Sequence, residues 1–217
     1  PAGETRSAFN RHVSGAEAKG GWVQRLRVHV GQGGRYEHFE LNCALVYSRI
    51  ELEVTLEEGA HFEFGGVTLG AGDARQEFVT KVIHAAPGST SNQVVRAVQW
   101  DRSTANFLGR VEVQRDAQKT DAAQNFRAML LEKGASANAK PELEIFADDV
   151  KCAHGAAIGA LDEQAAFYMA SRGIPPAEAK ALLVRAFIAD AFVAIPDQRV
   201  AERLMEEAVD YLAGAQL

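Results

Sequence analysis

The stretch Ile50-Glu-Leu-Glu-Val-Thr-Leu56 decides the fold class, because apolar and polar residues alternate along it without a break. Two further short runs follow it at Ala60–Phe64 and Val67–Leu69. Successive side chains of a β-strand point to opposite faces of the sheet, so a period of two is typical of a strand with one buried face. The stretch therefore predicts strands with an apolar inner face and a charged outer face.

Strand-like runs extend outward from this stretch over residues 22–150. Upstream, Leu26, Val28 and Val30 alternate with basic residues, whereas the first residues of the chain are polar and predict irregular structure. Downstream, the runs cover 78–83, 93–100, 109–114, 125–131 and 142–146, and glycine-containing turns separate them at 31–34, 70–73, 87–90 and 132–134. A spacing of roughly 8–17 residues fits a sandwich, a barrel or a solenoid. The Asn-Gly and Asp-Gly pairs of tight hairpins are absent, which favours a solenoid of stacked parallel rungs.

The hydrophobic period changes after Gly159 and predicts helices. Asp162 can cap a helix from Glu163 to about Arg172, with Gly173 as its stop. Pro175 and Pro176 suit the first turn of a second helix that Pro196 ends. The predicted apolar stripe of this second helix consists of Leu182, Leu183, Ala186, Phe187 and Phe192.

A third helix is predicted from about Asp197 to Leu212. Its apolar stripe consists of Val200, Leu204, Ala208, Tyr211 and Leu212. The change of period predicts a β domain over residues 1–158 and a helical domain over 159–217. Three short helices on a β body leave an apolar face exposed, which suits a protein partner.

Composition and charge exclude several classes of partner. A net charge of −6 without a Lys/Arg cluster argues against nucleic acid. No apolar run approaches the roughly 20 residues that span a bilayer, so no membrane association is expected. The chain shows no secretion pattern and has 2 cysteines, which predicts a cytoplasmic, reducing compartment. It opens at Pro1 without a methionine, which suggests part of a longer protein.

Cys152-Ala-His154 is the candidate for chemistry that remains once familiar motifs are excluded. The G-x-S-x-G elbow, the GxxxxGK[ST] loop and the HExxH pattern are all absent. Thiolate and imidazole bind zinc, copper and iron, and in an extended chain both side chains would share one face. Lys151 would favour the thiolate. A structural cysteine beside a hydrogen-bonded histidine is the alternative interpretation.

A count of ligands determines what kind of metal site this pair could form. Zinc ions and iron–sulfur clusters take about four protein ligands, so a metal here would need ligands from another chain. Cys43, within Leu41-Asn-Cys-Ala-Leu45, is expected in the core, and His84 is a weaker candidate for a polar site. The remaining histidines are expected to be ordinary surface or sheet residues: His12, His29, His38 and His61.

Around this pair the sequence resembles the SufB/SufD family of iron–sulfur cluster assembly proteins. Residues 142–159, ELEIFADDVKCAHGAAIG, resemble the family signature. Residues 161–174, LDEQAAFYMASRGI, continue it as the family's L-D-E-x-x-x-F-Y-x-x-S-R-G-I run, and residues 73–137 are similar more loosely. The glutamate-histidine-glutamate run of the SufB branch is absent and Cys152-Ala-His154 stands in its place, so the SufD branch is the closer match.

The resemblance implies a right-handed parallel β-helix followed by a small helical domain. It also implies a non-enzymatic scaffold subunit that pairs with a SufB-like paralogue and docks SufC, an ABC-type ATPase. His154, with Cys152 beside it, would hold a transient iron–sulfur cluster at the subunit interface, with no cofactor on the isolated chain. The ATPase would contact the helical region, and the candidate partner-binding residues are Phe167, Tyr168, Arg172, Gly173, Ile174, Leu182, Leu183 and Phe187.

Three alternatives stay open at this point. A homodimer is one state that the chain could adopt when the SufB-like partner is absent. A purely structural interaction module would leave Cys152 and His154 satisfied inside the sheet. A β-helix enzyme acting on carbohydrate would need clustered carboxylates on a solvent-facing sheet, whereas the acidic residues of 50–58 alternate as a solvated strand face.

Overall fold

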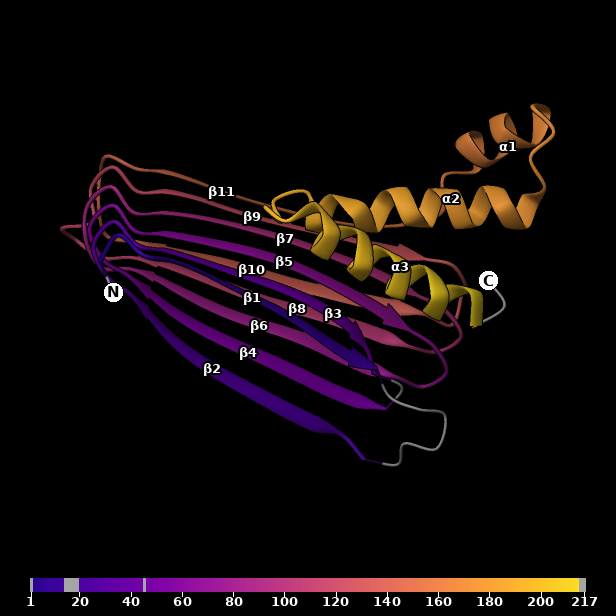
Figure 1. Ribbon diagram of the computed structural model, residues 1–217, viewed down its shortest axis with the longest axis horizontal. Helices are drawn as coiled ribbons and strands as arrows, with labels where there is room; N and C mark the ends of the chain where they lie inside the picture. Colours follow the sequence, from indigo (N-terminus) through magenta and orange to yellow (C-terminus); the bar gives the residue numbers. More distant parts are fainter. Residues whose placement is uncertain (1, 14–19, 45, 215–217) are drawn as a thin grey trace.

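A computed structural model describes residues 2–13, 20–44 and 46–214 of the chain. In these ranges the strands alternate between two sheets, and a helical segment follows (Figure 1). The odd-numbered strands form a six-stranded sheet, here sheet A, in the order β1-β3-β5-β7-β9-β11. The even-numbered strands form a five-stranded sheet, here sheet B, in the order β10-β8-β6-β4-β2. The strands are β1 (Thr5–Val13), β2 (Trp22–Val30), β3 (Arg35–Cys43), β4 (Tyr47–Leu56), β5 (His61–Gly70), β6 (Arg75–His84), β7 (Thr90–Gln99), β8 (Thr104–Val113), β9 (Asp121–Leu130), β10 (Ser136–Ile145) and β11 (Lys151–Ala160).

Every neighbouring pair of strands is parallel, so the chain winds as a β-helix and the predicted fold is confirmed. Register partners lie one rung apart, as Asp121 and Lys151 do. Several turns contain glycine where the backbone has a positive φ, for example 63° at Gly33 and 69° at Gly88, because a side chain is strained there.

The interior of the tube, here called the lumen, is filled by the inward side chains of both sheets. On β4, Ile50, Leu52, Val54 and Leu56 are buried, while the residues between them are partly exposed, as the alternation predicts. Aromatic rings stack from rung to rung, as Tyr36 and Phe62 do with centroids 5.9 Å apart. Burial of these side chains is the main stabilising contribution to the tube.

Two predictions about strands were wrong in extent. The first residues were expected to be irregular, but Thr5–Val13 forms β1 because it pairs with β3 along its whole length. The two short runs after residue 60 are a single strand, β5. Gly65 and Gly66 suggested a break between them, yet both lie within the strand, where neighbouring atoms leave no room for a Cβ. Leu45, in the run expected around Cys43, lies outside the described residues.

The outer face of sheet B carries ladders of opposite charges. Glu51 pairs with both Arg25 and Arg49, and Arg49 Nη1 donates to Glu77 Oε2 at 2.9 Å. The carboxylates on this face are thus engaged by basic neighbours from adjacent rungs. This is the solvated strand face predicted from residues 50–58.

The outer face of sheet A is largely apolar near the carboxyl ends of its strands, where helices cover it. The helical elements are α1 (Glu163–Ser171), α2 (Pro176–Ala189), the 3-10 turn η1 (Asp190–Phe192) and α3 (Gln198–Gly214). Sheet residues such as Phe39, Leu69 and Trp100 form one hydrophobic cluster with Ile188 and Leu204. In Figure 1, α2 and α3 lie along the sheet and α1 stands away from it. The helices therefore share a core with the tube, whose last described strand ends at Ala160, two residues beyond the predicted boundary.

The predicted ends of the first helix and the predicted start of the second are confirmed, whereas the second helix ends at Ala189 and not at Pro196. Asp162 Oδ1 accepts hydrogen bonds from the backbone N–H groups of Gln164 and Ala165 at 2.9 and 3.0 Å, which caps α1. Gly173, with φ 84°, follows its end, and Pro176 opens α2.

The predicted stripe of the second helix is only partly right. Ala179, Val184 and Ile188 are the buried residues of α2, whereas Leu182 and Ala186 face solvent. The helix is apolar on most of its circumference, so its period does not select a face and packing against sheet A does. The stripe of α3 is confirmed, with Leu204, Ala208 and Leu212 buried.

Candidate functional site

Cys152 and His154 lie on β11, the strand at one edge of sheet A. Their register partners on β9 are Ala122 and Gln124, which are both buried in the lumen. Cys152 and His154 therefore share the lumen-facing side of their strand, about 7 Å apart along it. The next positions of that side are Ala156 and Ile158, and Ile158 is 46% exposed. The same-face prediction for the pair is confirmed by this register.

Exposure differs between the two side chains because β11 is the last rung. Cys152 is half-buried and packs against the lumen cluster, whereas His154 is exposed. Burial raises the pKa of the Cys152 thiol, and the nearby carboxylate of Asp121 raises it further. The expectation that Lys151 favours the thiolate is wrong: adjacent residues of a strand point to opposite faces, and Lys151 is exposed on the other side.

The two side chains do not complete a metal site by themselves. Within the ranges that the structure describes, no group of three or more His, Cys, Asp and Glu side chains is placed to hold a metal ion. A thiol and an imidazole on one exposed edge can supply two ligands to a cluster or ion whose other ligands come from a second chain.

Cys43 and His84 are structural, the first as predicted. Cys43 is fully buried between sheet A and the helices, and burial raises the pKa of its thiol. His84 is fully buried in the lumen, where Ser89 Oγ lies 2.8 Å from its Nδ1 and Ser91 Oγ lies 2.9 Å from its Nε2. Burial lowers the pKa of His84 to about 4, which keeps the ring neutral.

A polar cluster at the other end of the lumen was missed. Glu40 is fully buried, and its carboxylate lies 2.9 Å from His38 Nε2 and 2.8 Å from His12 Nε2. Tyr36 Oη lies 2.9 Å from His38 Nδ1. His38 was expected to be an ordinary surface or sheet residue. The sequence carries no signal for the inward positions of His38 and Glu40, because both faces of β3 are buried from Glu37 to Cys43 and the alternation is lost there.

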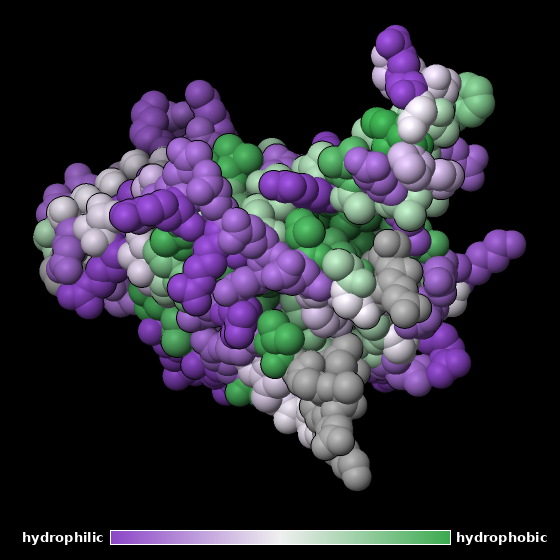
Figure 2. All heavy atoms as spheres, turned by 45° about the vertical axis from the view of Figure 1, so that its right-hand side comes forward, coloured by the Kyte–Doolittle hydropathy of each residue, from purple (hydrophilic) through white to green (hydrophobic). Residues whose placement is uncertain are grey.

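The residues predicted to bind a partner are accessible on the helical segment. Phe167 is 76% and Tyr168 59% exposed, and α1 has no buried residue. Arg172 lies over the Tyr168 ring, 5.1 Å from its centroid. Gly173 and Leu182 are exposed, and Ile174, Leu183 and Phe187 are partly buried. On the face in Figure 2, hydrophobic side chains gather between strongly hydrophilic ones around this segment.

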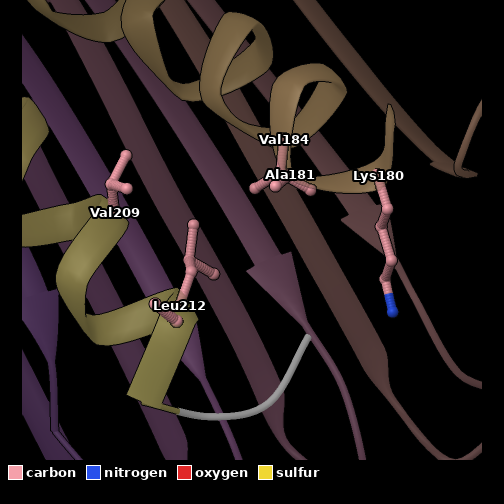
Figure 3. A pocket seen from close by; sticks show the side chains of 6 residues that line it. Lys180, Ala181, Val184, Val209 and Leu212 are labelled. Atoms are coloured by element: carbon pink, nitrogen blue, oxygen red, sulfur yellow. The ribbon is translucent and has the colours of Figure 1, made fainter. Parts of the chain in front are cut away.

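A small apolar pocket separates α2 from α3. Its volume is about 120 Å³, and Ala181 and Val184 of α2 lie opposite Val209 and Leu212 of α3 (Figure 3). In the described part of the chain, no helix combines the length and the apolar character that crossing a membrane requires.

Comparison with known proteins agrees with this architecture. The family model described as "SUF system FeS cluster assembly, SufBD core domain" matches residues 12–187. An iron–sulfur cluster assembly SufBD family protein of Synechocystis is 34% identical over 177 residues, which cover 81% of this chain and 39% of the relative.

Two relatives carry the name SufD. That of Escherichia coli is 36% identical over 124 residues, covering 57% of this chain and 29% of the relative, and that of Bacillus subtilis is 30% identical over 148 residues, covering 68% and 34%. The chain thus spans well under half the length of these relatives. The match of one family model to most of the chain confirms the resemblance: the chain belongs to the SufB/SufD family of the SUF system for iron–sulfur cluster assembly, on its SufD side.

Proposed function

We propose that the chain is a scaffold subunit of a SufBCD complex, where it assists iron–sulfur cluster assembly at an interface with a SufB-like partner. The observation that carries the proposal is the position of Cys152 and His154 on the lumen-facing side of an edge strand. The nascent cluster is the cargo of this site, and the partner supplies the remaining ligands.

The edge of β11 suits the addition of a partner strand. Among the described residues it pairs with β9 alone, so its other edge presents backbone N–H and C=O groups. Ile145, Phe146 and Ile158 are large exposed apolar side chains on the last rung, and they supply contact area around that edge. A strand added by the partner would bring its own side chains beside His154.

Replacing the imidazole tests the site. We expect His154→Ala to fold normally but to lower the iron and sulfide that co-purify anaerobically with the complex, because one ligand is lost. His29→Ala is the matched control, since His29 is exposed on the outer face of sheet B. Unchanged iron–sulfur enzyme maturation in cells that carry His154→Ala would refute the assignment.

The helical segment is proposed to dock the SufC ATPase. Phe167, Tyr168 and Leu182 are exposed apolar side chains on α1 and α2, where a second protein could bury them. Phe167→Glu should then abolish co-purification with the SufC-like partner. Val23→Glu changes an exposed valine on β2 and should leave it intact. Loss of co-purification with both variants, or with neither variant, would argue against a specific docking surface on the helical segment.

The remaining parts of the proposal concern context. Nucleotide hydrolysis belongs to the ATPase partner, and this chain acts without catalysis, in the cytoplasm, as a tube whose last strand is β11 followed by a helical segment that docks the partner. Without its SufB-like partner, the chain pairs with itself through the same edge.

A purely structural interaction module is the second candidate. The half-burial of Cys152 against the lumen cluster favours it for that residue. Under this alternative, Cys152→Ala and His154→Ala would both leave the cluster content of the complex unchanged.

A further inference from the structure

A column of lumen-facing residues leads through the tube to His154. Strand register places Phe64, Gln93, Gln124 and His154 side by side on β5, β7, β9 and β11. On sheet B, register places Thr80 beside Gly109. A Cβ at Gly109 would lie 2.8 Å from Gln124 Oε1, so the two columns meet at one level of the lumen.

Polar atoms at this level lack hydrogen-bond partners. Gln93 and Gln124 are 0% and 2% exposed. Neither atom of either amide, nor Thr80 Oγ1, has a partner among the described residues. An unpaired buried polar group costs about 1–3 kcal/mol, and a leucine at either position would avoid that cost. Two glutamines here therefore point to a function other than stability.

At this level of the lumen, the polar residues lie toward the β11 end of the tube and the apolar residues lie on the preceding rung. Leu52 and Phe64 occupy the same level on the preceding rung and are buried and apolar. On the other side of Gln124 comes His154, which is exposed. Adjacent strands are about 4.8 Å apart, so a single water molecule can bridge the Gln124 amide and the imidazole.

We propose that Gln124 is a positioning residue for His154, whose ring it orients through a bound water. The hydrogen bond fixes one ring nitrogen and leaves the other directed outward, toward the partner chain. Histidines that bind metals depend on such a hydrogen bond for tautomer and orientation. The inference deepens the proposed function, because it assumes that His154 is the residue that contacts the cargo.

The tautomer of His154 provides a direct test. Nitrogen-15 NMR of the full chain at pH 8, where an ordinary imidazole is neutral, reports which ring nitrogen carries the proton. In the unmodified protein, we expect one tautomer of His154 to exceed its share in a histidine of an unstructured peptide measured at the same pH. In Gln124→Leu, the tautomer ratio at His154 should move to that of the peptide.

Thr68→Val is the matched control, because Thr68 is a buried lumen residue that hydrogen-bonds Gln99 away from this level. It should leave the His154 tautomer unchanged. Gln124→Leu should change the melting temperature little, since no protein group among the described residues bonds the amide, yet it should lower cluster retention by the complex roughly 10- to 100-fold.

The outcomes separate this inference from the proposed function. An identical His154 tautomer in Gln124→Leu and in the unmodified protein overturns the positioning role, whatever His154→Ala does. A tautomer shift in Gln124→Leu, combined with normal cluster assembly in His154→Ala, supports the hydrogen bond and refutes the proposed function of the site.

Discussion

Arg96 on β7 and Asp190 in η1 are 94 residues apart in the chain, yet Arg96 Nε donates to Asp190 Oδ2 at 3.1 Å. The guanidinium is buried and also donates to the carbonyl oxygens of Val95 and Asn125, at 2.8 and 3.2 Å. Burial lowers the pKa of Arg96, and the Asp190 carboxylate offsets only part of that effect. The pair joins the outer face of sheet A to the turn that follows α2.

Removing the carboxylate should loosen this junction. Asp190→Asn leaves the buried guanidinium without its counter-ion, so the free energy of unfolding should fall by about 1–2 kcal/mol. This is the lower part of the range for a buried group that loses its partner, because Asp190 is half-exposed to water. A double-mutant cycle with Arg96→Met, followed by urea denaturation, measures the coupling. Additive single effects, within about 0.3–0.5 kcal/mol, would show that the pair contributes nothing.

Gly65 should be intolerant of any side chain. A Cβ there would lie 2.0 Å from the carbonyl oxygen of Ala191 and 2.6 Å from Phe39 Cδ1, so Gly65→Ala must displace η1 from the sheet. We expect a loss of about 1–3 kcal/mol in the free energy of unfolding and faster hydrogen exchange in α2. Gly159→Ala is the control, because nothing lies within 4 Å of its Cβ. Equal stability of both variants would contradict the close packing of η1.

His84 should make the protein sensitive to mild acid. Its pKa is about 4 in the folded chain against an ordinary 6.5, so the unfolded chain binds the extra proton first. The stabilising contribution is complete above pH 6.5 and falls by about 3 kcal/mol as the pH drops to 4. In His84→Gln, which retains hydrogen-bonding groups, the decline between these values should be smaller by that amount. Parallel stability curves over this range would exclude a neutral buried His84.

The contribution of Glu40 to the free energy of unfolding should change with pH over a more acidic range than that of His84. Burial alone would raise the pKa of its carboxyl group, but the contacts with His12 and His38 outweigh burial and hold the pKa below its usual 4.5. The contribution is therefore present above pH 4.5 and is lost as the pH falls further. Glu40→Gln should cost about 1–3 kcal/mol at pH 7, and the difference from the unmodified chain should shrink in acid. Glu53→Gln, on the outer face of sheet B, should cost much less at either pH.

The sequence was sufficient to predict the tube where only one face of a strand is buried. On β4, buried Leu52 alternates with charged Glu51 and Glu53, because the outer face of sheet B meets water. On β3, Glu37 to Cys43 are buried without interruption, since helices cover the outer face as well. Alternation disappears in such a strand, which is why the inward positions of His38 and Glu40 could not be predicted.

The shared face of Cys152 and His154 was predictable from their spacing, but the residues that lie beside them on β9 were not. Positions 152 and 154 must share a face in any extended strand, whatever the fold. Which side chains stand behind them depends on the register between β9 and β11, set by the length of the rung. Gln124 is separated from His154 by 30 positions, and nothing local distinguishes it from an ordinary polar strand residue.

The stacking of rungs also sets the order in which the protein can be built. During synthesis each new rung can pair with the rung before it, so turns of the tube can be added one after another from the N-terminal side. β11 emerges from the ribosome after every other strand described, and it pairs with a β9 already in place. A partner that bound β11, as proposed, would therefore bind a finished tube, and prematurely terminated chains would be left out of the assembly because they lack that strand.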